Sequence, residues 1–255
     1  MLLKIDTLSA RDKAVLMGLF LSRYDRQALD SLGFTGFRQA YNVLGLSIGF
    51  IPKSIQNYRD EFDPYFPNER KGWRNRELRD YCKMYMDLTE SFSFDEFYNV
   101  IVSMLESNMV DEKDIVKGHR KKNRKYLASR LITGKAAEEY FMMNYQSINQ
   151  FHGYDLYDTT QMGCGFDFNL SCGIQNFYVE VKGLNEKVGS LLLTEKEYVM
   201  AEDLRELYCL FVVSNFREKP DHRLFFNPLH TSQLDFKRQE LTIKQVSYSS
   251  KYLQL

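Results

Sequence analysis

Apolar residues in the first 110 positions recur at the spacing of amphipathic α-helices. Ser9 is typical of a helix start, and apolar residues follow it every three or four positions. Gly33 and Gly45 are placed to end two later helices, and Pro52 suits the first turn of another. The pattern predicts helices that begin near residue 9 and that cover 25–32, 37–44, 52–62 and 93–106.

Beyond about residue 150 the pattern changes to the two-residue alternation of β-strands. Residues 165–170 and 176–182 alternate on either side of an expected turn at 171–173, which predicts an antiparallel hairpin. The apolar run YCLFVV at 208–213 indicates a strand buried on both faces. A further strand pair is expected at 224–226 and 241–246.

Charged and capping residues add helices to this second half. The segment 111–130 is the most basic stretch of the chain and predicts one charged helix or two short ones, and another helix covers 136–143. Thr194 and Glu197 form a capping box that opens a helix to about Leu204, and capping alone accounts for both residues. We therefore expect an α/β (α+β) chain with a helical domain over 1–110 and a mixed sheet flanked by helices over 111–255.

Composition narrows the class of protein. The 255 residues are 44% hydrophobic, and no run is long and apolar enough to span a bilayer. The first 13 residues lack the features of a signal peptide, so we expect a cytoplasmic location. A net charge of zero argues against a non-specific polyanion binder but permits a basic face. The four cysteines and four histidines lack the spacing of a zinc site, and we expect no disulfides.

The candidate chemistry lies in GFDF (165–168) and YVEVKG (178–183). Because strand side chains alternate, Glu180 and Lys182 point to one face, while Val179 and Val181 point to the other. Asp167 lies on the partner strand, with Phe166 and Phe168 expected to point away from it. The hairpin is thus predicted to gather two carboxylates and one ammonium group on a single face.

Two neighbouring carboxylates repel each other, and burial adds to the cost. A divalent cation offsets both effects, and carboxylate oxygens with waters are the ligands that Mg²⁺ prefers. A nearby lysine orients water or stabilises developing negative charge, which suits metal-assisted hydrolysis of a phosphodiester. The alternative is that Glu180 and Lys182 are ordinary exposed residues of an edge strand.

The segments GKAAEEYF, GYDLYDTT, GFDF, YVEVKG, LLLTEKEY and YCLFVV, between about 130 and 215, resemble the PD-(D/E)XK nuclease superfamily. Within it they are most similar to the domain at the C-terminus of the plant protein NO VEIN. The resemblance implies that Asp167, Glu180 and the Val181 carbonyl bind the metal and that Lys182 positions the attacking water. It implies a further acidic residue at Glu138, for which the adjacent Glu139 is an alternative. The proline expected before the aspartate is Phe166 here.

Residues 37–61 read as helix, short turn and helix, the arrangement of a DNA-binding helix-turn-helix. The segment that follows surrounds a tryptophan with basic residues. A plain supporting or dimerising helical bundle is the alternative. The residues expected to contact bases or phosphates are Lys53, Ser54, Gln56, Asn57, Arg59, Arg70, Lys71, Trp73, Arg74 and Arg76.

We therefore expect a type II restriction endonuclease that cuts double-stranded DNA at a specific sequence with Mg²⁺. Cutting both strands of a palindrome needs two active sites, which predicts a homodimer. A cognate DNA methyltransferase is expected in the same system, but not as a stable complex. The alternatives are a defence nuclease that senses modified or foreign DNA, and a non-catalytic DNA-binding protein that keeps the nuclease fold.

Overall fold

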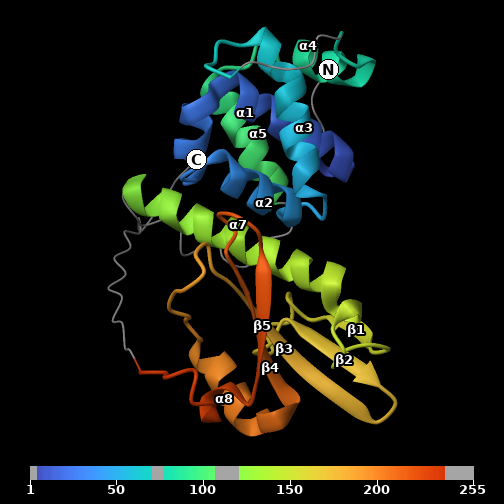
Figure 1. Cartoon of the computed structure of the whole chain (residues 1–255), viewed down its shortest axis with the longest axis vertical. Coiled ribbons are helices and arrows are strands. Elements are labelled where there is room, and N and C mark those ends of the chain that lie inside the picture. The colour runs from blue at the N-terminus through green and yellow to red at the C-terminus, as the bar shows by residue number, and fades with distance from the viewer. Residues whose placement is uncertain (1–4, 71–76, 107–120, 239–255) are drawn as a thin grey trace, which may run out of the picture.

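The computed structural model describes residues 5–70, 77–106 and 121–238 (Figure 1). In Figure 1 a group of helices lies at one end of the molecule, a sheet lies at the other, and one long helix crosses between them. The helices are α1 (Ala10–Leu32), α2 (Phe37–Ser47), α3 (Pro52–Phe62), α4 (Asp80–Leu88), α5 (Phe94–Glu106), α7 (Lys121–Asn144) and α8 (Glu195–Leu204). The strands are β1 (Asp155–Asp158), β2 (Phe168–Cys172), β3 (Gln175–Gly183), β4 (Tyr208–Ser214) and β5 (Asp221–Phe226).

Helix α1 is the centre of the helical part, and most of its side chains between residues 14 and 22 are fully buried. It begins at the predicted Ser9 cap, whose hydroxyl accepts a hydrogen bond from the Asp12 backbone N–H at 3.2 Å. It ends at Gly33, as predicted, with left-handed backbone angles there. The expected helix boundary near Asp25 is a kink, because that residue has a φ of 42° inside the helix. Helix α4 was not predicted.

Helices α2 and α3 pack against each other across a short turn. The prediction that Gly45 ends the first of them is wrong, because α2 continues to Ser47. Gly45 instead permits a close approach: a Cβ atom there would lie 2.7 Å from the Cα of Pro52, the first residue of α3. The glycine is therefore required by packing between the two helices and not by the end of a helix.

Glycine at 134, in the middle of α7, has no such role. A Cβ atom there would meet nothing within 4 Å. We expect Gly134→Ala to raise the free energy of unfolding by about 0.5–1 kcal/mol, because alanine is the better helix former. Urea unfolding would measure this change. Gly45→Ala is the contrasting variant and should lower the free energy of unfolding, because its Cβ atom would collide with Pro52. A Gly134→Ala protein less stable than the parent would contradict the expectation.

Within the described ranges, the strands form one sheet in the order β1-β2-β3-β4-β5, with β3 and β4 parallel and the other neighbours antiparallel. The predicted hairpin is β2–β3, and the predicted buried strand is β4. The first strand of the hairpin begins only at Phe168, and β1 was not predicted. Strand β5 pairs with β4, while the segment 241–246 that was expected to pair with it lies outside the described residues.

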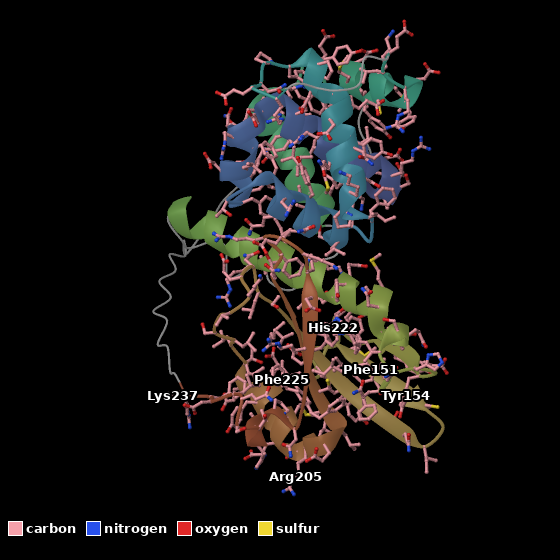
Figure 2. The ribbon with its side chains drawn as sticks, in the orientation of Figure 1. Phe151, Tyr154, Arg205, His222, Phe225 and Lys237 are labelled. Carbon is pink, nitrogen blue, oxygen red and sulfur yellow. The ribbon has the colours of Figure 1, made fainter. Side chains whose placement is uncertain are left out.

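Helix α7 covers one face of the sheet and also contacts α2 (Figure 1). Its Phe141 ring packs on Phe168 of β2 and Phe211 of β4, with centroids 5.0 and 4.8 Å apart. Phe151, labelled in Figure 2, extends this aromatic core to Phe177 at 5.7 Å. The expectation of separate helices before 130 and after 136 is wrong over 121–144, where one helix is continuous. The domain boundary at 110/111 stays a prediction.

The four cysteines are free, so no disulfide links them. None of the helices in the described ranges is both long and apolar enough to cross a bilayer.

Candidate active site

Strand β3 divides its side chains between two environments. Val179 and Val181 lie on the face covered by α7, because their partners in the register belong to the aromatic core. Glu180 and Lys182 lie on the opposite face, as the alternation predicts. Glu180 is only 4% exposed, so it is not an ordinary residue of an open edge strand. The strand has neighbours on both sides, which excludes the edge-strand alternative.

Asp167 is fixed just before β2 by hydrogen bonds to both neighbouring strands. Its backbone N–H donates to the Val179 carbonyl at 2.9 Å, and its carbonyl accepts from the Thr159 N–H at 2.9 Å. Its carboxylate accepts a hydrogen bond from the Val181 N–H at 2.8 Å. Because the N–H and C=O of a strand residue point to the same neighbour, the Val181 carbonyl is directed toward this side of β3 as well.

The neighbours of Asp167 differ from one expectation. Phe168 enters the core below α7, but the Phe166 ring packs on Tyr178, 4.9 Å between centroids, and Tyr178 shares the face of Glu180. The two phenylalanines therefore do not lie on one side. Residues 165–167 precede the strand, so the alternation that holds from Phe168 onward does not extend to Phe166.

The two carboxylates influence each other electrostatically. Burial, followed by the negative charge of Glu138, raises the pKa of Asp167 to about 7, although the Val181 N–H and Lys182 oppose the shift. Burial, followed by the charge of Asp167, raises the pKa of Glu180 well above its ordinary value. Each carboxyl group thus lies in a site where a negative charge is costly unless a cation joins it.

Lys182 makes the nearest cationic contact. Its Nζ lies 2.5 Å from Glu180 Oε1 and 2.7 Å from Glu197 Oε2. Burial alone would lower the pKa of Lys182, but the charges of Glu180 and Glu197 outweigh it and raise the pKa. The side chain is therefore an ammonium group that donates hydrogen bonds at neutral pH.

Glu197 also contacts this cluster, which the sequence alone does not predict. The predicted capping box of α8 is present: the Glu197 N–H donates to Thr194 Oγ1 at 3.3 Å, and the Thr194 N–H donates to Glu197 Oε2 at 3.0 Å. The same oxygen also accepts the hydrogen bond from Lys182. Capping explained the residue locally, so only the packing of α8 beside β3 reveals its second contact.

Helix α7 carries two further carboxylates, which share one lysine partner. Lys135 Nζ lies 3.2 Å from Glu138 Oε2 and 3.3 Å from Glu139 Oε1. Glu138 acts on Asp167, as the raised pKa above shows. Glu139 faces the α2–α3 turn instead, since its Oε2 lies 3.4 Å from the position of a Cβ atom on Gly49. Which of the two glutamates is the additional acidic residue stays a prediction.

The donor set suits a hard divalent cation. Four formal negative charges meet only two ammonium groups in this region, and the ligands offered are carboxylate and carbonyl oxygens. No group of three or more His, Cys, Asp or Glu side chains in the described ranges is arranged to hold a metal ion. Mg²⁺ commonly takes one or two carboxylates and completes its shell with water and substrate phosphate, so a partial set fits it. The four acids are Glu138, Asp167, Glu180 and Glu197, and the two ammonium groups are Lys135 and Lys182.

The predicted DNA-contact residues of α3 fall into two groups. Lys53 is exposed, and Ser54, Gln56 and Asn57 are half-buried beside it, with Lys53 Nζ donating to Gln56 Oε1 at 2.8 Å. Arg59 is buried, with 8% exposure, and its guanidinium pairs with Asp60 at 2.5 Å. The prediction that Arg59 contacts DNA is therefore wrong, because the side chain is enclosed in an ion-pair network.

Of the predicted DNA-contact residues that follow α3, only Arg70 lies within the described residues. Arg70 pairs with Asp25 at 2.6 Å and with Asp63 at 2.9 Å, so its position has a structural explanation. Lys71, Trp73, Arg74 and Arg76 lie outside the described residues, as does the 111–120 part of the predicted basic segment.

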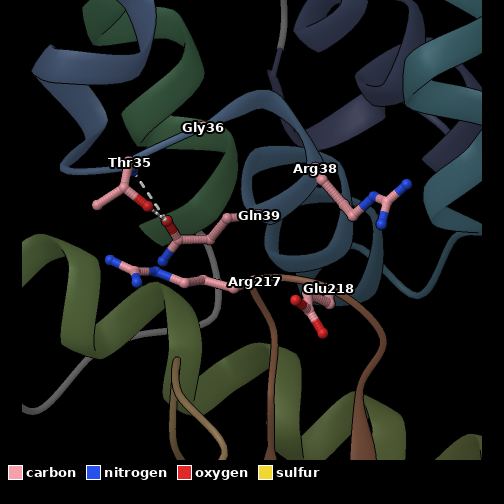
Figure 3. Close-up of a pocket in the computed structure, with 6 residues that line it drawn as sticks. All are labelled: Thr35, Gly36, Arg38, Gln39, Arg217 and Glu218. Carbon is pink, nitrogen blue, oxygen red and sulfur yellow. Dashed lines mark hydrogen bonds between the residues drawn. The ribbon is translucent and has the colours of Figure 1, made fainter.

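A surface pocket between α2 and the β4–β5 loop is separate from the acidic site (Figure 3). Gln39 Oε1 accepts hydrogen bonds there from the N–H and hydroxyl of Thr35, at 2.9 and 3.0 Å. Arg38 and Arg217 also line it, and Arg217 Nε is paired with Glu186 at 2.8 Å. None of the predicted catalytic side chains lines this pocket.

Comparison with known proteins bears on the sheet and its flanking helices. No curated protein and no solved structure gives a significant match to the chain. Residues 137–226 match the family model described as "Protein NO VEIN, C-terminal". The matched segment runs from α7 to β5 and includes Glu138, Asp167, Glu180, Lys182 and Glu197. About a third of the chain is thus similar to the NO VEIN C-terminal family of nuclease-like domains, as the sequence motifs indicated.

Proposed function

We propose that this chain is a Mg²⁺-dependent endonuclease of the PD-(D/E)XK type that hydrolyses phosphodiester bonds in double-stranded DNA, as type II restriction enzymes do. The observation that carries the proposal is the buried face of β3. There Glu180 is influenced by the charge of Asp167, and both lie within the electrostatic reach of Lys182. Such a cluster of mutually repelling buried acids is costly for folding and is typical of a site kept for its chemistry.

In this proposal Asp167, Glu180 and the Val181 carbonyl hold Mg²⁺, with Glu138 as an outer acid. When bound, the ion supplies positive charge that offsets the negative charge developing on the phosphate. Lys182 acts as a hydrogen-bond donor, because its raised pKa keeps it protonated. It orients the attacking water or stabilises a phosphate oxygen. Attack in line with the leaving 3′ oxygen leaves a 5′-phosphate and a 3′-hydroxyl.

The helical part supplies DNA recognition in the proposal, through α2 and α3 as a helix-turn-helix. Support comes from α7, which carries Glu138 toward Asp167 and Glu139 toward the α2–α3 turn. The start of α3 and the acidic site are therefore connected through adjacent residues of one helix. Two copies of the chain would place two such sites on a palindrome.

The first test is digestion of plasmid and phage DNA, methylated and unmethylated, by the full chain with Mg²⁺ or with EDTA. We expect discrete fragments only with Mg²⁺, and none from Lys182→Ala. Lys187→Ala is a matched control, since Lys187 is an exposed lysine in the loop that follows β3. Intact DNA from the parent protein on every substrate would refute the proposal, and cutting of methylated DNA alone would favour a modification-sensing nuclease.

The recognition role of α3 has its own test. We expect Lys53→Ala to weaken DNA binding by about three- to tenfold, the usual size of one lost phosphate contact, and to reduce its salt dependence. Fluorescence anisotropy with a duplex in Ca²⁺ buffer would measure both effects. Lys83→Ala, at an exposed position of helix α4, is the control. Equal affinities for the Lys53→Ala and parent proteins would remove α3 from the DNA interface.

A further inference from the structure

Lys182 has two carboxylate partners, which come from different elements of the fold. Glu180 lies two residues away on β3, whereas Glu197 reaches the ammonium from the first turn of α8, at 2.7 Å. We propose that Glu197 is a positioning residue that keeps Lys182 in place when a divalent cation takes over Glu180. This inference rests on the proposed function, because it assigns Glu180 to the cation.

Competition for one carboxylate is the basis of the argument. Lys182 Nζ lies 2.5 Å from Glu180 Oε1, so a cation bound by Glu180 and the ammonium group would compete for the same negative charge. Lys182 has a side chain only 21% exposed, and an ammonium group left there without a partner would be strongly disfavoured. Glu197 provides the remaining carboxylate contact, so Lys182 can leave Glu180 without losing its charge or its position.

The carboxylate of Glu197 is itself held in place by the backbone. The Thr194 N–H donates to Glu197 Oε2 at 3.0 Å, and this is the oxygen that contacts Lys182. A charged group anchored in this way needs little reorganisation to hold its partner. The capping box of α8 therefore serves two purposes: it begins the helix and it fixes the second support of the lysine.

The two purposes can be separated by substitution. Glu197→Gln keeps a side chain that is accepted at the third position of a capping box but removes the charge. Thr194→Ala removes the hydroxyl cap and leaves the charge of Glu197. Glu195→Gln is the matched control, because Glu195 is an exposed glutamate in the same first turn.

The experiment measures Mn²⁺ binding to the full chain by calorimetry, together with kcat and KM for DNA. We expect Glu197→Gln to weaken Mn²⁺ binding about tenfold and to lower kcat about 10- to 100-fold, with KM unchanged. Glu195→Gln should match the parent within about twofold, and Thr194→Ala should lower the melting temperature with a smaller effect on Mn²⁺.

The decisive comparison repeats Glu197→Gln in a Lys182→Ala background. If Glu197 acts through Lys182, its substitution then changes Mn²⁺ affinity by less than about twofold. An equal loss in both backgrounds, or no loss in the parent, would overturn the proposal. Mn²⁺ binding without DNA cleavage would refute the nuclease function alone. The Mn²⁺ affinities in the parent and Lys182→Ala backgrounds would still decide the role of Glu197. A parent protein that binds no Mn²⁺ would overturn both.

Discussion

Replacing Asp167 by asparagine is expected to abolish DNA cleavage and, at the same time, to stabilise the metal-free protein at pH 8. Cleavage should fall at least about a thousandfold, as for removal of a central catalytic group. The fold should survive, because an asparagine oxygen can still accept the hydrogen bond from the Val181 N–H. The gain in stability follows from the electrostatics of the site.

The sign of the stability change comes from the pKa of Asp167. Folding raises this pKa from its ordinary value of 3.8 to about 7, so the folded chain binds the proton more tightly than the unfolded chain does. The contribution to stability is complete below pH 3.8 and is lost as the pH rises through about 7. The parent therefore carries an uncompensated cost at pH 8, which a neutral asparagine lacks. For a partly buried side chain we expect a gain of about 1–2 kcal/mol.

Urea unfolding at pH 5 and pH 8 in EDTA measures this effect, and the gain should be smaller at pH 5. Adding Mg²⁺ should reverse the order at pH 8, because a ligand that binds only the folded parent stabilises it by mass action. Asp203→Asn, an exposed position on α8, is the control and should change little. An Asp167→Asn protein that is less stable than the parent in EDTA at pH 8, or that still cuts DNA, would contradict the account.

The part of this site that could be predicted is the part that local geometry determines. Alternation along β3 places Glu180 and Lys182 on one face whatever surrounds the strand. The pairing of the two strands as a hairpin could also be predicted locally, but their register could not. The observed turn is at residues 173 and 174, which brings Asp167 opposite Glu180, whereas a turn at 171–173 would place residue 167 opposite residue 177. The helix boundaries set by Ser9, Gly33 and Thr194 were predictable for the same reason.

The part that could not be predicted depends on packing between distant segments. The capping box is enough to explain Glu197 from the local sequence. Its contact with Lys182 exists only because the fold brings the start of α8 close to β3. The sequence predicts a surface position for Arg59, because arginine on a polar helix is usually exposed. Its burial depends on tertiary contacts that the sequence does not reveal. These contacts are with acidic side chains such as Asp63 and with aromatic rings such as Phe37, whose centroid lies 4.7 Å from the Arg59 Cζ atom. The sequence predicts a helix end at Gly45, because the contact of this residue with Pro52 is tertiary and leaves no local signal.

The buried ion-pair network around Arg59 leads to the second large effect. Asp63 is 3% exposed and joins three segments of the helical part. Its carboxylate accepts hydrogen bonds from Ser22 Oγ at 2.7 Å and from Arg70 Nε at 2.9 Å, and it lies 3.6 Å from Arg59 Nε. We expect Asp63→Ala to lower the free energy of unfolding by about 3–5 kcal/mol, because it leaves two guanidinium groups without this shared partner.

Urea unfolding at neutral pH measures the loss, and Glu218→Ala provides the contrast. Glu218 pairs with Lys187 at 3.5 Å on the surface, where both side chains are more than half exposed, so its removal should cost no more than about 0.5 kcal/mol. The loss for Asp63→Ala should persist at 1 M salt, since buried pairs are screened far less than exposed ones. A loss below about 1 kcal/mol would mean that the network contributes little to folding. Because Arg59 and Asp63 fix α3 against α1, a destabilised network should also weaken DNA binding, although neither side chain reaches the proposed DNA interface.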